Sequence, residues 1–155
     1  MRFLILTALL FISPFSFADR KPKYSTLKTF ESDGCTGFVE GTREQPKLWA
    51  HCCFEHDLRY WFGGSEENFD HSDLELRSCV DSVAGDKWAN LIYRGVRAGH
   101  ASPVKSKYHW AWGWLPKRNK VALSPADIVY VESELRKLSL EPAYVDAFIE
   151  KYLRN

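Results

Sequence analysis

The residues best suited to chemistry lie in one short run, Cys52-Cys53-Phe54-Glu55-His56-Asp57-Leu58-Arg59-Tyr60. An imidazole can act as a general base near neutral pH, and a carboxylate is a ligand for hard cations. On a helix, His56 and Tyr60 share a face because they are four residues apart, and Asp57 points about 100° away from His56. One helix can therefore present a base and a cation ligand beside each other.

A loop with three glycines precedes this run and adds a second carboxylate. Residues 33–42 read Asp-Gly-Cys-Thr-Gly-Phe-Val-Glu-Gly-Thr. Glycines allow a loop to turn its backbone carbonyls inward, and Ca²⁺ takes about six to eight oxygen ligands, many of them carbonyls. The sequence therefore predicts a calcium site between Asp57 and this loop, with Asp33 as a further ligand.

The first residues have the pattern of a secretory signal peptide. Arg2 is followed by an apolar run from Phe3 to Phe17, and Ser16 and Ala18 are the small residues of a cleavage site. The alternative is a membrane anchor, but the run is shorter than the roughly 20 residues of a membrane span, and Pro14 interrupts it. We expect cleavage after residue 18 and a secreted or periplasmic protein.

The charge balance gives no sign of a nucleic-acid partner. Removing residues 1–18 takes away one basic side chain, Arg2, and leaves 20 Lys and Arg against 20 Asp and Glu. Binding to nucleic acid would require a basic excess. Residues 19–155 suit one domain, which we expect to be a monomer.

Four cysteines follow the cleavage site, and an even number in an oxidising compartment predicts two disulfides. The adjacent Cys52 and Cys53 point about 100° apart on a helix, so each should reach a different partner. Cys35 then pairs with one of them and Cys79 with the other. A zinc site is the alternative, although export and the lack of a Cys-x-x-Cys spacing disfavour it; its ligands would come from His51, Cys52, Cys53, His56 and Cys79.

The fold class expected is all-α, with one antiparallel helix pair carrying the reactive residues and further helices toward the carboxyl terminus. Gly63-Gly64 separates the first two helices, Ser65 caps the second, and so short a link implies an antiparallel pair. The predicted helices cover residues 46–62, 66–84, 86–97, 125–138 and 142–153.

Residues 98–121 are expected to be irregular, with a short hairpin at residues 110–114. This stretch holds three tryptophans and three cationic residues: Trp110, Trp112, Trp114, Lys117, Arg118 and Lys120. Such residues favour membrane interfaces, so they could form a docking rim. We favour the alternative, in which the tryptophans pack over the helices, because Trp is usually largely buried.

The run from Cys52 to Tyr60 resembles the active-site helix of secreted phospholipase A2. Asp73, six residues before Cys79, resembles the aspartate of the second catalytic helix in that family. Asp33-Gly34-Cys35 resembles the start of the calcium loop in bacterial and fungal members. The resemblance covers about residues 33–79, and the glycine-rich loop of the animal enzymes is not reproduced.

The resemblance implies a calcium-dependent esterase that hydrolyses glycerophospholipid acyl esters at a membrane or micelle surface. His56 would activate water, Asp73 would orient His56, and Tyr60 would hydrogen-bond Asp73. Without that role, Asp73 would pair with Arg77 one helical turn on.

The resemblance also implies a set of calcium ligands and a disulfide pairing. The ligands would be Asp57, Asp33 and the carbonyl group of Gly34. The disulfides would be Cys35–Cys53 and Cys52–Cys79. Two alternatives stay open: a non-catalytic calcium- or lipid-binding module on the same scaffold, and a structural or partner-binding protein of the cell envelope.

Overall fold

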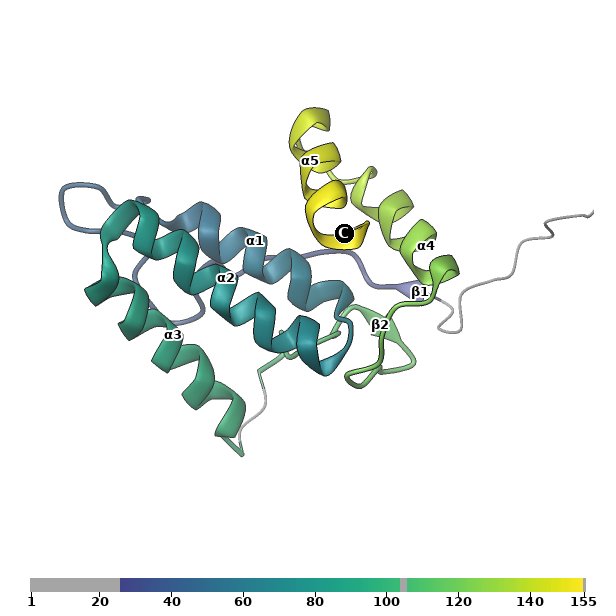
Figure 1. The fold of residues 1–155 in the computed structure, drawn as a ribbon, viewed down its shortest axis with the longest axis horizontal. Helices are drawn as coiled ribbons and strands as arrows, with labels where there is room; N and C mark the ends of the chain where they lie inside the picture. The colour runs from purple at the N-terminus through teal and green to yellow at the C-terminus, as the bar shows by residue number, and fades with distance from the viewer. Residues whose placement is uncertain (1–25, 104–105, 155) are drawn as a thin grey trace, which may run out of the picture.

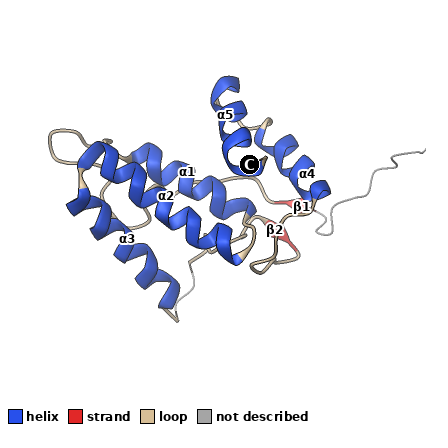
Figure 2. Ribbon diagram, in the orientation of Figure 1, coloured by secondary structure: helices blue, strands red, loops and turns tan. Residues whose placement is uncertain are grey.

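The chain is mostly helical, with five helices and a two-stranded sheet in the part described by the computed structural model, residues 26–103 and 106–154. The predicted signal peptide lies outside these residues. In chain order the elements are β1 (Thr26–Leu27), α1 (Ala50–Phe62), α2 (Glu66–Ala84), α3 (Asp86–Ala101), β2 (Trp114–Leu115), α4 (Pro125–Leu135) and α5 (Pro142–Leu153). Helices α1, α2 and α3 lie side by side, with α4 and α5 together at one end (Figures 1 and 2).

The predicted antiparallel pair is α1 and α2. Gly63 ends α1 with φ +67°, and a Cβ there would lie 2.4 Å from that of Ala111, so this turn requires glycine. Ser65 caps α2 as predicted, and Asn68 completes a reciprocal capping box. Because the turn is so short, α2 folds directly back along α1.

Three helix limits differ from the prediction. Helix α1 begins at Ala50 rather than at Pro46, because the Trp49 N–H donates to the Glu40 carbonyl (3.0 Å) and holds residues 46–49 against the preceding loop. Helix α3 continues to Ala101, beyond the predicted Arg97, and α4 ends at Leu135.

The predicted hairpin at residues 110–114 is wrong, because β2 pairs with β1 instead, with Leu27 opposite Trp114. The segment lies across the end of α1, where the last carbonyls of a helix have no partners within the helix. The N–H of Ala111 donates to the Tyr60 carbonyl (2.7 Å), and the Trp114 indole donates to the Phe62 carbonyl (2.7 Å).

The proposed docking rim of tryptophans is also wrong. Trp110, Trp112 and Trp114 are 7%, 4% and 1% exposed, so all three belong to the interior. Their indoles pack over the helices, which is the other arrangement that the sequence left open. No helix among the described residues is long and apolar enough to cross a membrane.

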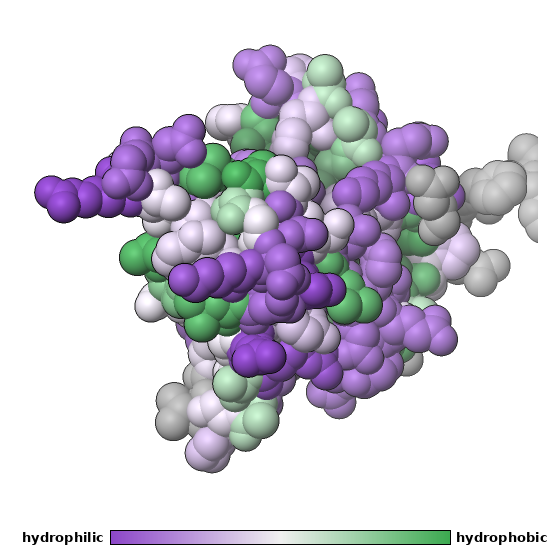
Figure 3. Space-filling view, turned by 60° about the vertical axis from the view of Figure 1, so that its left-hand side comes forward, coloured by the Kyte–Doolittle hydropathy of each residue, from purple (hydrophilic) through white to green (hydrophobic). Residues whose placement is uncertain are grey.

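Two groups of buried residues hold the helices together. The smaller, which we call the cystine core, comprises Trp49, Cys52, Cys53, Leu76, Val80, Ala89 and Ile92. The larger, the aromatic core, comprises Leu58, Tyr60, Trp61, Phe62, Phe69, Trp110, Ala111, Trp112, Trp114, Val131, Leu135, Val145, Phe148, Ile149 and Leu153. Helix α1 contributes to both, so the two cores meet along it. On the face seen in Figure 3, hydrophobic residues form separate patches among hydrophilic ones.

Candidate active site

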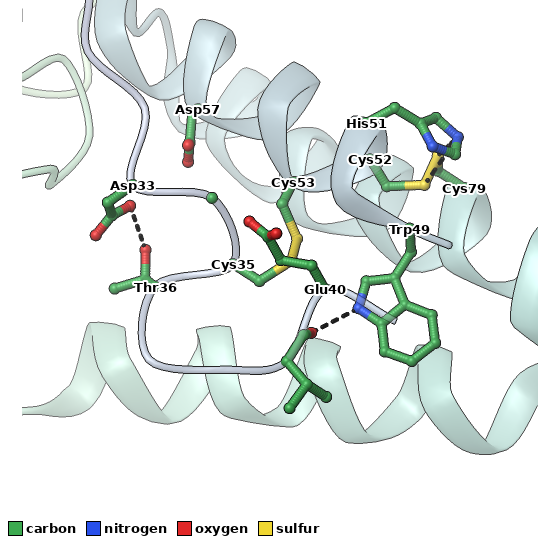
Figure 4. Close-up of a disulfide and its surroundings, with 12 residues drawn as sticks. Asp33, Cys35, Thr36, Glu40, Trp49, His51, Cys52, Cys53, Asp57 and Cys79 are labelled. Carbon is green, nitrogen blue, oxygen red and sulfur yellow. Dashed lines mark hydrogen bonds between the residues drawn. A yellow bond between two sulfur atoms is a disulfide. The ribbon is translucent and has the colours of Figure 1, made fainter. Parts of the chain in front are cut away.

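Two disulfides fix the glycine-containing loop and α2 to α1. Cys35 is bonded to Cys53, and Cys52 is bonded to Cys79 (Figure 4). This is the pairing that the family resemblance implies, and disulfides of this kind are consistent with an oxidising compartment. His51 lies beside the second disulfide, 3.4 Å from the Cys52 sulfur.

The zinc alternative loses its ligands in this arrangement. Among the described residues, His51, Cys52 and Cys79 are the one group of three His, Cys, Asp or Glu side chains whose ligand atoms all lie within 4.8 Å of one another. Metal binding requires thiolates, whereas these two sulfurs are bonded to each other.

His56 and Asp73 face each other between α1 and α2. The His56 Nε2 lies 3.0 Å from Asp73 Oδ1, and the two residues are 8% and 0% exposed. A carboxylate can only accept hydrogen bonds, so Nε2 carries the proton and Nδ1 keeps the lone pair. Burial lowers the pKa of His56, an effect that Asp73 partly offsets, so the imidazole is neutral at pH 7 and can accept a proton.

Tyr60 donates a second hydrogen bond to the same carboxylate. Its hydroxyl lies 2.7 Å from Asp73 Oδ1, and burial together with Asp73 raises the pKa of Tyr60, so it remains protonated. Burial alone would raise the pKa of Asp73, but hydrogen bonds from His56 and Tyr60 outweigh it and the pKa is lowered. The alternative bridge is not formed, because Arg77 donates to Asn90 instead.

Two residues of α3 complete this network, and the sequence alone predicted a role for neither. Arg97 Nη1 lies 3.2 Å from Asp73 Oδ2 and 2.7 Å from Asp70. His100 Nε2 lies 2.6 Å from the Tyr60 hydroxyl. Their spacing places both on one face of a helix, but no sequence signal indicates that this face meets Asp73.

Asp57 lies one residue after His56 and is only 8% exposed. Its carboxylate accepts a hydrogen bond from the Ser32 hydroxyl (2.5 Å). Burial, together with the nearby charge of Asp33, raises the pKa of Asp57 to about 7, although the hydrogen bond from Ser32 lowers it. Asp33 is exposed and accepts from the Thr36 hydroxyl (2.8 Å), while Asp57 projects from α1 toward the loop (Figure 4).

The surroundings of Asp57 fit a hard cation. Among the described residues, no Lys, Arg or His forms an ion pair with this carboxylate, although a buried charge without a partner is costly. Gly34 has φ +69°, and a Cβ there would lie 2.0 Å from Glu40 Oε1, so the loop needs glycine at this point. The oxygen ligands of Asp57 and Asp33 and the Gly34 carbonyl are of the type that Ca²⁺ prefers.

A cleft of about 1420 Å³ opens onto His56, Asp57 and Gly34. His56, Asp57 and Tyr60 line it from α1, the loop forms one side, and α3 forms another. Its volume exceeds the roughly 300–1,000 Å³ of sites that bind drug-sized ligands. The apolar and glycine residues in its lining, suited to a hydrocarbon chain, include Phe38, Leu76, Ile92, Gly95, Val96 and Gly99.

Comparisons with known proteins add no relative to this picture. No protein-family model, curated protein or solved structure matches the chain. Any function of the site must therefore be inferred from the chemistry of its own residues.

Proposed function

We propose that the chain is a secreted, calcium-dependent esterase of the phospholipase A2 type, acting on glycerophospholipid acyl esters. The observation that carries the proposal is the buried His56–Asp73 pair, of which His56 lines a large cleft beside the buried carboxylate of Asp57. The resemblance of residues 33–79 to the active-site segment of that family supports the same conclusion. A His–Asp pair by itself is common to many hydrolases. The carboxylate of Asp57 next to it favours a hydrolase that also uses a metal ion.

The reaction would proceed by activation of water. His56 Nδ1 takes a proton from water as its oxygen attacks the carbonyl carbon of the ester. Asp73 holds the His56 ring in place and stabilises the imidazolium that forms. His56 then returns the proton to the departing alcohol, and the products are a fatty acid and a lysophospholipid.

Calcium would bind between α1 and the preceding loop, held by Asp57, Asp33 and the Gly34 carbonyl. When bound, it would polarise the ester carbonyl and counter the charge of the substrate phosphate. The Cys35–Cys53 disulfide keeps the loop that carries two of these ligands against α1. Because its pKa is raised to about 7, chiefly by burial, Asp57 is partly protonated at neutral pH. That proton would leave when the carboxylate binds a cation.

The test is fatty-acid release from phospholipid vesicles at millimolar calcium, with and without a chelator. A general base contributes roughly 10²–10⁴-fold to a rate, so His56→Gln should lose at least 100-fold. His71→Gln is the matched control, because His71 is an exposed histidine of α2 that pairs with Glu75 (3.6 Å) on its own helix. Chelation should abolish release by the wild type and by this control.

Equal release by the wild type and by His56→Gln would contradict the proposal. Wild-type protein that binds calcium and vesicles but releases no fatty acid would instead indicate the non-catalytic alternative. The calcium site can be tested apart from catalysis by calorimetric titration of Asp57→Asn with calcium. This change should abolish calcium binding whether or not the protein is an enzyme.

A further inference from the structure

The Tyr60 hydroxyl stands between two polar partners from different helices. It lies 2.7 Å from Asp73 Oδ1 on α2 and 2.6 Å from His100 Nε2 on α3. Both distances are those of hydrogen bonds. Helix α3 lies outside the residues that resemble phospholipase A2, so that resemblance does not imply the contact with His100.

Counting protons gives the direction of both bonds. A tyrosine hydroxyl has one proton, and the Asp73 carboxylate has none to give. If Tyr60 donated to His100, its oxygen would face Asp73 Oδ1 at 2.7 Å with no proton between them. Tyr60 therefore donates to Asp73, and His100 Nε2 donates to Tyr60.

We propose that His100 is a positioning residue of the esterase site, which directs the Tyr60 proton toward Asp73 by donating its own Nε2–H to the Tyr60 oxygen. Through Tyr60 it holds the carboxylate that orients His56. The proposal rests on the proposed function only in the claim that this orientation serves catalysis. The direction of the hydrogen bonds is independent of that claim.

The surroundings of His100 fit this role. Asp73 faces it from α2, with 3.5 Å between His100 Nδ1 and Asp73 Oδ2, and Arg97 shares that oxygen at 3.2 Å. The Phe69 ring lies 4.4 Å away, centroid to centroid, and fixes the plane of the imidazole.

His100 Nε2 carries a proton in both charge states of the imidazole. Burial lowers the pKa of His100, Asp73 raises it, and Arg97, His56 and Lys120 lower it again. In the cationic form both ring nitrogens carry a proton. In the neutral form the single proton sits on Nε2, because its contact with Tyr60 is 2.6 Å, whereas Nδ1 is 3.5 Å from Asp73 Oδ2, too far for a good hydrogen bond. Tyr60 therefore receives the same hydrogen bond in either state.

Two variants separate positioning from packing. His100→Phe keeps a ring beside Phe69 and Tyr60 but has no donor, whereas His100→Gln keeps an N–H donor without the ring. Losing one hydrogen bond in such a network should lower kcat of His100→Phe roughly 10-fold, with KM little changed. His100→Gln should retain most of the activity, and equal loss in both variants would overturn the proposal.

A double-mutant cycle with Tyr60→Phe tests the route of the effect. If His100 acts through the Tyr60 hydroxyl, His100→Phe should cause no further loss once that hydroxyl is absent. Independent, multiplicative losses would contradict the proposal, because they would mean that His100 acts elsewhere.

A measurement that needs no activity keeps this inference apart from the proposed function. Nitrogen-15 NMR of labelled histidine should show His100 Nε2 bearing a proton in the wild type. Its signal should shift in Tyr60→Phe and stay unchanged in the control His71→Gln. An unprotonated Nε2 would overturn the inference, even if the protein proved to be a fully active esterase. The expected spectrum from a protein that releases no fatty acid would support the hydrogen-bond direction and reject only the proposed function.

Discussion

The cystine core and the aromatic core hold the same helix by different means. The first half of α1 is fixed by two disulfides, to a loop at Cys35 and to α2 at Cys79. The second half is held by apolar and aromatic packing against residues more than forty positions further along the chain, such as Trp110 and Phe148.

The comparison separates two tasks. The cystine core places chemical groups, because its disulfides bring the loop and α2 to Asp57 and His56 over short stretches of chain. The aromatic core contains most of the buried hydrophobic residues, and burial of apolar surface is the dominant favourable term in folding. His56 lies where the two meet, between Cys53 and Leu58.

The largest effect on stability is expected in the aromatic core. Phe148 of α5 is 4% exposed and contacts Phe62 and Tyr152 through ring edges and faces. Phe148→Ala should lower the free energy of unfolding by about 3–5 kcal/mol, the usual cost of removing a buried phenyl ring. Urea denaturation followed by circular dichroism measures this. Val129→Ala is the control, because Val129 is 68% exposed on α4. A loss below 1 kcal/mol would mean that α5 is not part of the cooperative unit.

Removing each disulfide in turn tests whether the cystine core positions the site as well as stabilising the fold. Replacing either pair of cysteines by serine should lower the free energy of unfolding by about 3 kcal/mol, slightly more for Cys52–Cys79, whose closed loop is longer. Calcium affinity should fall much more without Cys35–Cys53, because this disulfide holds the ligand loop. Calorimetric titration of both double variants with calcium measures this difference. Equal calcium affinities in the two variants would contradict the proposal that the loop at Cys35 carries calcium ligands.

The raised pKa of Asp57 should be visible in the pH dependence of the free energy of unfolding. Burial raises its pKa to about 7 in the folded protein, above the value near 3.8 expected in the unfolded chain. The folded state therefore binds this proton more tightly, and the stability it supplies is complete below pH 3.8 and is lost as the pH rises through 7. In chelator, Asp57→Asn should be more stable than the wild type at pH 8, by on the order of 1–3 kcal/mol.

That difference should vanish near pH 4, where the carboxyl group is protonated in both states. Asp33→Asn serves as the control, because Asp33 is exposed and should change stability little. A wild type that is as stable as Asp57→Asn at pH 8 without calcium would contradict the assignment of Asp57 as an unpaired buried carboxylate.

The smallest effects are expected at two matching helix caps. Ser65 and Ser124 both accept a hydrogen bond from the third residue of their helix within a capping box. Ser65→Ala should lower the free energy of unfolding by about 1 kcal/mol. Ser124→Ala should cost more, because its partner Asp127 is 1% exposed and loses a donor inside the protein. Thermal unfolding of both variants shows which loses more stability. A larger loss for Ser65→Ala would mean that the burial of Asp127 does not add to the cost of removing its cap.

The parts of the fold that follow from local patterns agree with the sequence analysis. The Gly63-Gly64 break, the Ser65 cap and the proline at the start of α5 mark helix ends by short-range chemistry. The start of α1 did not follow, because Trp49 hydrogen-bonds a loop carbonyl nine residues earlier.

Long-range contacts account for the other differences. Pairing of Leu27 with Trp114 joins segments nearly ninety residues apart, and no local pattern specifies it. The same holds in the candidate site, where the spacing of His56, Asp57 and Asp73 was readable. His100 reaches Tyr60 only through the packing of α3 on α2, which no motif encodes.

The sharing of α1 by two cores limits how far this protein can be cut down. A fragment ending at Gly85 would keep both cystines, the His56–Asp73 pair and the proposed cation ligands, but it would lose His100. It would also expose much of the apolar surface of Leu58, Trp61 and Phe62, since most other residues of the aromatic core come from the carboxyl-terminal part of the chain. Such a minimal catalyst would require a redesigned, polar exterior along the second half of that helix before it could stay dissolved.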